Sequence, residues 1–247
     1  TGMTLGQRIR ESTIGRSIWR ATDRTTERDQ AAGHWANFFL HIYPVKVRRK
    51  EITFRYSWYL GVASVVLFGS LVVSGIYLMF FYVPSPSQAY GDILNLQTQV
   101  AFGQYIRNVH RWSAHLMVLV VAAHMARVFY RGAYKSPREF NWGIGVVLLV
   151  LTLLLSFTGY LLPWDQLAFW AVTVGTEMAA FVPLIGDTVK EMMLGGPVVA
   201  SSTLLRFYVL HVAVLPLALV LVLTIHLWRW RKDSMLDAGK EAVDVDA

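Results

Sequence analysis

Cysteine is absent from the 247 residues of the sequence. A disulfide bond, a thiolate-bound zinc, an iron–sulfur cluster and a thioether-linked haem all need cysteine side chains, so this chain supplies none of them. Any metal that the chain holds must therefore be ligated by histidine or carboxylate groups.

Charged residues are also scarce. They make up 16% of the sequence, whereas a soluble domain carries about 25%, and hydrophobic residues reach 55%. This balance indicates a membrane protein. Nine tryptophans and eleven tyrosines fit the aromatic belts that form at membrane–water interfaces.

Four apolar stretches are long enough to span a bilayer. They cover roughly residues 57–83, 109–128, 142–162 and 207–228. Each reaches the ~20 residues that a helix needs to cross the hydrocarbon core. The sequence therefore predicts an all-α integral membrane protein whose four spanning helices form a bundle.

The connecting segments differ in charge, and the difference orients the helices. Residues 1–56 hold eleven Lys and Arg against five Asp and Glu, and residues 127–141 hold four against one. Residues 163–206 hold four acidic residues against two basic ones, and residues 84–107 hold one of each. Because basic segments stay on the cytoplasmic side, both termini are predicted to be cytoplasmic. The net charge of +7 then reflects topology and contact with anionic lipids rather than nucleic-acid binding.

Two histidine pairs lie inside these spans: His110 with His124, and His211 with His226. Their spacings of 14 and 15 residues correspond to about 21–23 Å of helix and roughly four turns, so each pair keeps to one helix face. The second and fourth spans run in the same direction, which places His110 and His211 near the outer side and the other two near the cytoplasm. Intramembrane histidines are costly and usually functional. Two matched depths predict two stacked haems with two axial histidines each; zinc is disfavoured because it would lack ligands.

Four glycines repeat the histidine spacing. Gly61 and Gly75 in the first span are 14 residues apart, and so are Gly145 and Gly159 in the third. A glycine lets a bulky group approach the helix backbone, so we expect these glycines to face the two haems. Ordinary packing of small residues between membrane helices is the alternative interpretation.

Residues around the histidines add to this prediction. Arg107 and Arg127 each lie within one helical turn of a histidine, where they would pair with haem propionates; for Arg127, snorkelling to the interface is the alternative. Pro216 lies between the histidines of the fourth span, and a kink there would absorb the extra residue of the 15-residue spacing. His115 lies about 140° around the helix from His110, so it is not expected to be a ligand.

Three segments together resemble the cytochrome b family of quinol:cytochrome c or plastocyanin oxidoreductases. They read RNVHRWSAHLMVLVVAAHMARVFYRGAYKSPRE, GYLLPWDQLAFWAVTVGTEMAAFVPLIGD and LLRFYVLHVAVLPLALVLVLTIHLWRWRK. They are similar to the family's second span with its loop, its surface helices between the third and fourth spans, and its fourth span. The match covers about residues 54–232. The 15-residue spacing, HRWSA and LPWDQ are similar to the split, cytochrome b6-like branch, in which this four-helix, di-haem part is one polypeptide.

The resemblance implies one subunit of a bc-type enzyme complex, in which quinol is oxidised at the outer face and quinone is reduced at the inner face in a Q cycle. It implies as partners a Rieske iron–sulfur protein, a c-type cytochrome and a subunit IV-like protein with the PEWY motif of the quinol site, a motif absent here. It also implies a homodimeric complex, two non-covalent haem b groups and a location in the bacterial cytoplasmic membrane.

Further site residues follow from the same resemblance. The wall of the outer quinol site would comprise Phe169, Trp170, Ala171, Val172, Thr173, Pro183 and Ile185; packing of a membrane-surface helix is the alternative. Asp165 and Glu177 are candidate proton acceptors there. Arg231 and Lys232 match a basic pair near the inner quinone site, with membrane anchoring as the alternative.

Two features depart from the cytochrome b6 pattern. That branch has a cysteine two residues before Gly61 that binds a third haem covalently; this sequence has Tyr59 there, so a third haem would not be thioether-linked. The basic N-terminal extension, residues 1–56, is longer than expected, and residues 5–19 are compatible with either an interfacial helix or a solvated extension. We expect the di-haem domain over residues 57–232 and a cytoplasmic tail over residues 233–247.

Two other functions are compatible with four such spans. A di-haem b-type membrane anchor that links the quinone pool to a peripheral dehydrogenase or reductase would keep the histidine pairs, but it would need neither the surface-helix sequence nor a Rieske partner. A haem-free four-helix subunit or transporter would use the histidines only as hydrogen-bonding groups.

Overall fold

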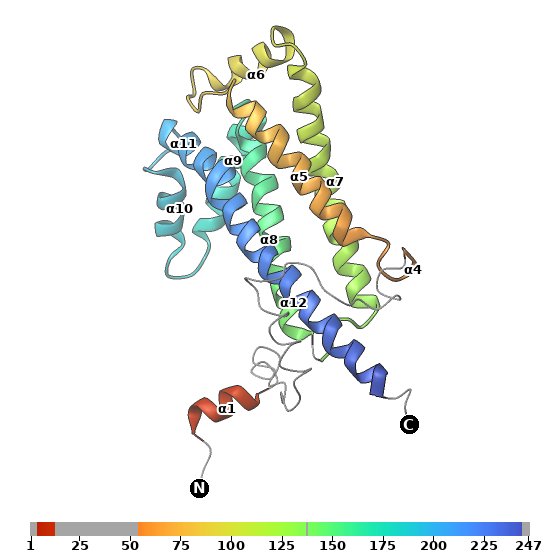
Figure 1. The fold of residues 1–247 in the computed structure, drawn as a ribbon. Helices are drawn as coiled ribbons and strands as arrows, with labels where there is room; N and C mark the ends of the chain where they lie inside the picture. The colour runs from red at the N-terminus through yellow and green to blue at the C-terminus, as the bar shows by residue number, and fades with distance from the viewer. Residues whose placement is uncertain (1–3, 13–53, 137, 244–247) are drawn as a thin grey trace. The chain divides into compact units, whose positions relative to one another are not determined.

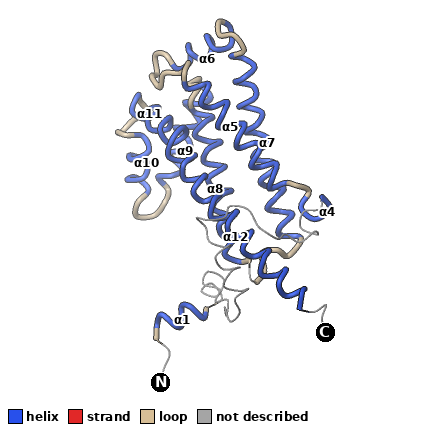
Figure 2. Tube along the Cα trace, in the orientation of Figure 1, coloured by secondary structure: helices blue, strands red, loops and turns tan. Residues whose placement is uncertain are grey.

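The computed structural model describes residues 4–12, 54–136 and 138–243, and within them all regular structure is helical (Figure 2). Four stretches of helix are long and apolar enough to cross a membrane: Leu60–Met79, Gly103–Tyr130, Glu139–Leu161 and Ser201–Arg231. At most 17% of the apolar window of any of these helices is buried inside the protein. Their side chains therefore suit a lipid surround, and the predicted four-span membrane fold is confirmed.

The helices follow one another along the chain as labelled in Figure 1. They are α1 (Leu5–Glu11), α4 (Phe54–Ser57), α5 (Leu60–Met79), α6 (Ala89–Thr98), α7 (Gly103–Tyr130), α8 (Glu139–Leu161), α9 (Gln166–Ala180), α10 (Gly186–Leu194), α11 (Ser201–Val209), the π-helical turn η1 (Leu210–Val214) and α12 (Leu215–Val243). The first span begins later than predicted because Trp58 and Tyr59 both have positive φ angles, 52° and 53°, which separate α4 from α5.

The chain divides into two compact units, each of which contains one histidine of α7. The first, here called the His124 unit, comprises residues 1–61, 122–149 and 220–247; the second, the His110 unit, comprises residues 62–121 and 150–219. Each unit is described by itself below.

The His110 unit has a small apolar core where the end of α8, α9 and α11 meet. Leu161, Val172 and Phe207 form its buried centre, and partly buried neighbours such as Phe157 and Leu210 pack against it. α9 and α10 pack on each other, and α10 also contacts α11 (Figure 1). The surface helices predicted between the third and fourth spans are therefore present.

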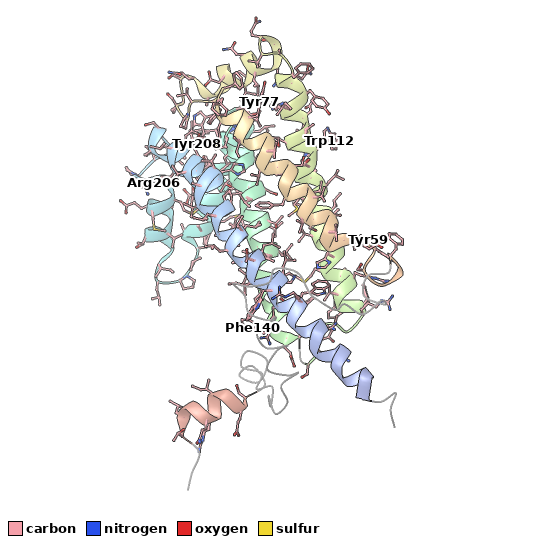
Figure 3. The ribbon with its side chains drawn as sticks, in the orientation of Figure 1. Tyr59, Tyr77, Trp112, Phe140, Arg206 and Tyr208 are labelled. Atoms are coloured by element: carbon pink, nitrogen blue, oxygen red, sulfur yellow. The ribbon has the colours of Figure 1, made fainter. Side chains whose placement is uncertain are left out.

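Local capping fixes the ends of these surface helices. The Asp165 carboxylate caps α9 by accepting a hydrogen bond from the Ala168 N–H at 2.8 Å. Gly195 ends α10 with a φ of 75°, a left-handed conformation that favours glycine. Arg206 of α11, labelled in Figure 3, donates to the backbone carbonyl of Met192. These contacts hold the α9–α11 connection in one arrangement.

The His124 unit is rich in aromatic contacts at the ends of its helices. Phe129 stacks on Tyr134 with ring centroids 5.2 Å apart, and both contact Trp142 near the start of α8. The guanidinium of Arg229 lies 5.4 Å from the ring centre of Phe140, which is labelled in Figure 3. Such a cluster is typical of the membrane–water interface.

The N-terminal helix α1 covers only part of the predicted interfacial segment. Its cap is complete, because Thr4 and the side chain of Gln7 satisfy each other's backbone N–H groups. Leu5 and Ile9 are exposed, as an interfacial helix requires. Residues 13–53 lie outside the described residues, so the rest of the predicted segment and the HWANFFLHIYP region stay predictions.

Candidate functional site

His110 of α7 and His211 of η1 face each other in the His110 unit. Their ring centroids are 6.2 Å apart and their ring planes make an angle of 73°. With ~2 Å for each metal–nitrogen bond and roughly 1 Å from each nitrogen to its ring centre, two axial histidines hold their ring centres about 6 Å apart. The pair is therefore spaced for one metal ion between the two rings.

The far side of the His110 ring is fixed by Ser74 of α5. The Ser74 hydroxyl donates to the carbonyl of Ser70 at 2.6 Å and lies 2.9 Å from Nδ1 of His110. Because the hydroxyl proton points to Ser70, Oγ accepts from His110 and Nδ1 carries the ring proton. This tautomer leaves the Nε2 lone pair of His110 available for a metal.

The His211 ring is fixed in the same way by α8. Its Nδ1 lies 3.1 Å from the carbonyl of Leu155 and 3.2 Å from the Thr158 hydroxyl. Thr158 in turn donates to the carbonyl of Leu154 at 2.9 Å. Both acceptors require a proton on Nδ1, so the Nε2 lone pair is again free. Metal-ligating histidines almost always have such a partner behind them.

The glycines of this unit lie against the same two rings. A Cβ added to Gly75 would lie 3.2 Å from Cε1 of His110, and one added to Gly159 would lie 2.5 Å from Cε1 of His211. The second distance is an overlap that no alanine avoids without movement of the ring. The predicted spacing of the glycines thus brings them to the histidines, where they give the rings room.

The π-turn η1 explains the unequal histidine spacing better than the predicted kink. It spans Leu210–Val214, and the Leu215 N–H bonds the Leu210 carbonyl, five residues back. A π-turn carries one residue more than an α-helical turn, which equals the difference between spacings of 15 and 14. Pro216 follows two residues after the turn and lacks an N–H. The extra residue is therefore absorbed at the ligand itself, one turn before the proline.

The His124 unit contains the second pair, on α7 and α12. A Cβ on Gly61 would lie 3.4 Å from Cε1 of His124, and one on Gly145 would lie 3.6 Å from Cε1 of His226. These are ordinary or nearly ordinary contacts. Nδ1 of His226 is buried without a formed hydrogen bond, although the backbone of Asn141 is near enough to act on the ring. The second pair is thus built on the same plan with looser contacts.

The donor set identifies the kind of metal group that fits. Among the described residues no three His, Cys, Asp or Glu side chains converge on one point, so a closed zinc site of four protein ligands is not formed there. A porphyrin supplies four ligands to its iron and needs only two axial imidazoles from the protein. Two facing histidines with glycines at their rings fit that group.

Each histidine of α7 has an arginine three residues away in the sequence. Arg107 is half-buried on α7, within electrostatic reach of Arg111 and Asp165. The guanidinium of Arg127 lies 4.3 Å from the ring centre of Trp58, a cation–π contact that holds it at the end of α7. Neither position conflicts with a propionate-binding role, which stays a prediction.

The predicted wall of the outer quinol site falls in two different settings. Val172 is fully buried in the core of the His110 unit, and Ala171 packs against that core. Phe169 and Trp170 are exposed, and Thr173 is half-buried, with its hydroxyl turned back to the Phe169 carbonyl at 2.8 Å. Pro183 and Ile185 are exposed in the turn between α9 and α10. The burial of Val172 and Ala171 is explained by packing of the surface helix α9.

The two candidate proton acceptors are both engaged. Glu177 forms an ion pair with Lys190 at 2.5 Å. Asp165 caps α9 and also lines a shallow hollow with four neighbours: Tyr90, Trp164, Gln166 and Leu167.

Tyr82 contacts the backbone directly after the end of α8. Its hydroxyl donates to the Leu162 carbonyl at 2.6 Å, and its ring stacks on Tyr208 of α11 at 5.6 Å, a residue labelled in Figure 3. Burial raises the pKa of Tyr82 above its usual value, and Tyr208 and Asp92 add to the effect. Tyr82 therefore stays protonated as a donor.

The remaining predicted residues lie in the His124 unit. Arg231 of α12 is buried, with Nε and Nη2 unbonded, and the side chain of Lys232 lies outside the described residues. Tyr59 is exposed in the left-handed turn before α5 and lies beside Phe54 (Figure 3).

Sequence reasoning missed Ser74, Thr158 and the π-turn. The signal for the two hydroxyl residues was present, because each directly precedes a predicted glycine, Gly75 or Gly159. The 15-residue spacing was the only signal for the π-turn. His115 is exposed and its ring contacts that of Trp112.

Comparisons with known proteins agree on one family. Residues 47–234 match the family model described as Cytochrome b/b6/petB. The sequence is 45% identical to the cytochrome b6 of Heliomicrobium gestii over 178 residues, 72% of this chain and 84% of that one. It is 43% identical over 176 residues to the cytochrome b6 of Prochlorococcus marinus (strain MIT 9515), 71% and 81% of the two chains.

The fold is similar to that of a chain in the solved structure titled Hyperthermophilic respiratory Complex III. The TM-score is 0.68 at 28% sequence identity, and the match covers 85% of this chain and 53% of that chain. The present chain thus spans about half the length of that structural relative.

Proposed function

The chain belongs to the cytochrome b/b6 family, and on this basis we propose that it is the di-haem subunit of a Rieske/cytochrome b quinol oxidoreductase. Family membership makes it a multi-pass membrane cytochrome b that binds haem b and serves a bc-type oxidoreductase complex. The finer statements below, which concern the number of haems, the substrate and the partners, are the proposal.

The geometry of His110 and His211 carries this proposal. The ring centres are 6.2 Å apart, both Nδ1 atoms are occupied by acceptors on α5 or α8, and both Nε2 lone pairs are left for iron. A hydrogen-bonding histidine in a transporter would not need this spacing or a glycine against each ring. His124 and His226 repeat the plan, so we assign one haem to each pair.

The chain's own residues bind and orient these groups. Two histidines would hold each haem and leave its iron no free position, so the haem, when bound, would carry single electrons and would not activate a ligand. Ser74 and Thr158 hold the rings of the His110 pair. The apolar faces of the spans keep water from the sites, and Arg107 and Arg127 are available for the propionates.

The direction of electron flow follows from the orientation of the spans. With both termini cytoplasmic in a bacterial membrane, the His110 pair is the outer site and the His124 pair the inner site. Quinol would be oxidised near α9 and the α9–α10 turn, with Phe169, Trp170, Thr173, Pro183 and Ile185 as the exposed part of the wall. Quinone would be reduced near Arg231 and Lys232.

The proposal needs partners from other chains. A Rieske protein would take one electron from each quinol, a c-type cytochrome would receive it, and a subunit IV-like chain would complete the quinol site in a homodimeric complex. Copurification of a Rieske protein and a PEWY-bearing subunit with this chain would separate this function from that of a di-haem membrane anchor.

Single histidine substitutions test the two-site assignment. Membranes that contain the intact complex are titrated for haem b by the pyridine haemochrome assay, and two per chain are expected. His110→Ala should remove the haem of the outer pair and His124→Ala that of the inner pair, so that each variant keeps about one haem, whereas His115→Ala should keep both. Two haems in His124→Ala would show that this residue is not a ligand.

A further inference from the structure

Two buried hydroxyl groups distinguish the His110 site from the His124 site. Ser74 and Thr158 directly precede the glycines that face the rings, and they are 4% and 2% exposed. At the corresponding places before Gly61 and Gly145 the chain has Leu60 and Ile144. The two sites therefore differ at both positions in the same sense, with a hydroxyl at one site and an aliphatic side chain at the other.

Each hydroxyl is a link in a directed hydrogen-bond chain. The imidazole N–H of His110 donates to Ser74, and Ser74 donates to the Ser70 carbonyl. The N–H of His211 is shared between the Leu155 carbonyl at 3.1 Å and the Thr158 hydroxyl at 3.2 Å, and Thr158 donates to the Leu154 carbonyl. Consecutive bonds that run in one direction polarise each other. The hydrogen bonds from the two hydroxyls to the carbonyls of Ser70 and Leu154, one turn earlier on the same helix, also fix the direction of each hydroxyl oxygen.

An acceptor behind a ligating imidazole makes the ligand more basic. A more basic ligand favours the oxidised iron, which carries one more positive charge, and so lowers the reduction potential. Hydrogen bonding behind the axial ligand is one of the means by which a protein tunes a haem. The side chains of Leu60 and Ile144 provide no hydroxyl acceptor at the other pair, where the backbone of Asn141 is the group near the ring of His226.

We propose that Ser74 and Thr158 are positioning residues that hold the His110 pair in its ligating tautomer and lower the potential of the haem bound there relative to that of the His124 pair. This inference rests on the proposed function, since it takes both histidine pairs to be haem ligands. It goes beyond that function by naming the side chains that make the two sites unequal.

The test is a redox titration of the intact complex in membranes, followed at the visible band of haem b. In the double variant Ser74→Ala/Thr158→Val, we expect the potential of one haem to rise while the other stays unchanged. A tenfold change in the ratio of ferric to ferrous affinity corresponds to about 59 mV for a one-electron couple. The conservative pair Ser74→Thr/Thr158→Ser should restore the wild-type value, because each keeps a hydroxyl.

Ser70→Ala is the matched control. Its hydroxyl lies one turn away on the same helix, 3.2 Å from that of Ser113, and its backbone carbonyl still accepts from Ser74. The reverse variant, Ile144→Thr, places a hydroxyl before Gly145 and should lower the potential of the haem at the His124 pair.

Three results decide the matter. If the double variant shifts one potential and Ser70→Ala shifts neither, the inference holds. The double variant could instead lose stability or haem while its haem potentials remain equal to those of Ser70→Ala. The hydroxyls would then contribute to packing only, and this inference would fail while the proposed function would stand. If the wild-type complex holds no haem that depends on His110 and His124, the proposed function fails and this inference fails with it.

Discussion

The two histidine pairs follow one plan, but the protein holds their rings with different tightness. At the His110 pair, a Cβ on the facing glycines would lie 2.5 and 3.2 Å from the nearest ring atom; at the His124 pair the same distances are 3.4 and 3.6 Å. The first pair also has two hydroxyls behind its rings and one ring on a π-turn. The second pair has Leu60 and Ile144 in place of the hydroxyls.

This difference shows that the spacing of the glycines and the residues beside the glycines have separate effects on the sites. The 14-residue repeat of the glycines is the same on α5 and α8, so it brings one glycine of each helix to each site but does not distinguish the two sites. The side chains one residue before each glycine differ between the sites, and at the His110 site both hydrogen-bond to a ring. Variants at the His110 pair should therefore be more damaging than the equivalent variants at the His124 pair.

The largest effect is expected from removal of the π-turn, which only the His110 pair has. Deletion of Ala213 forces an α-helical turn directly before Pro216, and a proline ring that clashes in a helix costs about 3 kcal/mol or more. The His110-site haem should be lost. Deletion of Ala213 together with Pro216→Ala should restore it, because a regular helix then accommodates the shorter segment. Haem content by pyridine haemochrome measures both.

An insertion provides the opposite control. One extra alanine after Val222 lies in the α-helical part of α12 and rotates His226 by about 100° relative to the residues before it. This variant should lose the haem of the His124 pair instead. Retention of both haems after the Ala213 deletion alone would mean that the π-turn and the proline are independent.

The second effect compares alanine at two glycines. Gly159→Ala places a Cβ 2.5 Å from the ring of His211, which is held by the Leu155 carbonyl and Thr158, so relief by ring movement breaks those bonds. Overpacking of this kind costs about 1–3 kcal/mol. Gly145→Ala, with 3.6 Å available, should bind haem normally. Equal haem retention on heating in the two variants would remove the contrast in tightness.

The histidines, the spans and the glycines were readable from sequence because each carries a periodic signal. Intramembrane histidines are rare, and their 14- and 15-residue spacings keep them on one face. The signal for Ser74 and Thr158 was weaker, namely their place directly before a predicted glycine, because hydroxyl residues are ordinary in membrane helices, where they commonly bond back to the preceding turn. Only the structure shows that these two also reach a ring.

The surface helices show a second feature that the sequence alone does not predict. Their presence followed from the LPWDQ segment, but the sequence does not say which face of α9 is buried. Val172 belongs to the core with Leu161, whereas Trp170 is exposed. Contacts from α8 and α11, which are distant in sequence, decide that difference.

A smaller effect is expected from Tyr82→Phe in the His110 unit. The change removes the donor to the Leu162 carbonyl, three residues after Gly159, and keeps the ring that stacks on Tyr208. A hydrogen bond of this type contributes about 0.5–1.5 kcal/mol, so the His110-site haem should be released at a slightly lower temperature. Tyr105→Phe, an exposed position on α7, is the control and should behave as wild type.

The direction of the Tyr82 pKa adds a pH test to this variant. Burial raises the pKa of Tyr82 in the folded protein, so the unfolded chain loses this proton first as the pH rises. The stability linked to Tyr82 is therefore complete below about pH 10 and declines above it. Tyr82→Phe should make the thermal midpoint less sensitive to pH in that range; an unchanged alkaline slope would argue against a buried, protonated Tyr82.

The smallest effect is expected from Trp58→Leu, which tests the looser His124 unit. The indole ring lies 4.3 Å from the guanidinium of Arg127, and an exposed cation–π contact contributes about 0.5–1 kcal/mol. Loss of the ring should weaken retention of the His124-site haem about two- to fivefold, because the guanidinium of Arg127 is then held less firmly beside a propionate. Trp112→Leu, at an exposed site on α7, is the matched control, and haem transfer to apomyoglobin measures both. A weaker His110 site in Trp58→Leu would show that the two pairs are coupled, and their different tightness would then belong to the whole bundle instead of to each set of neighbours.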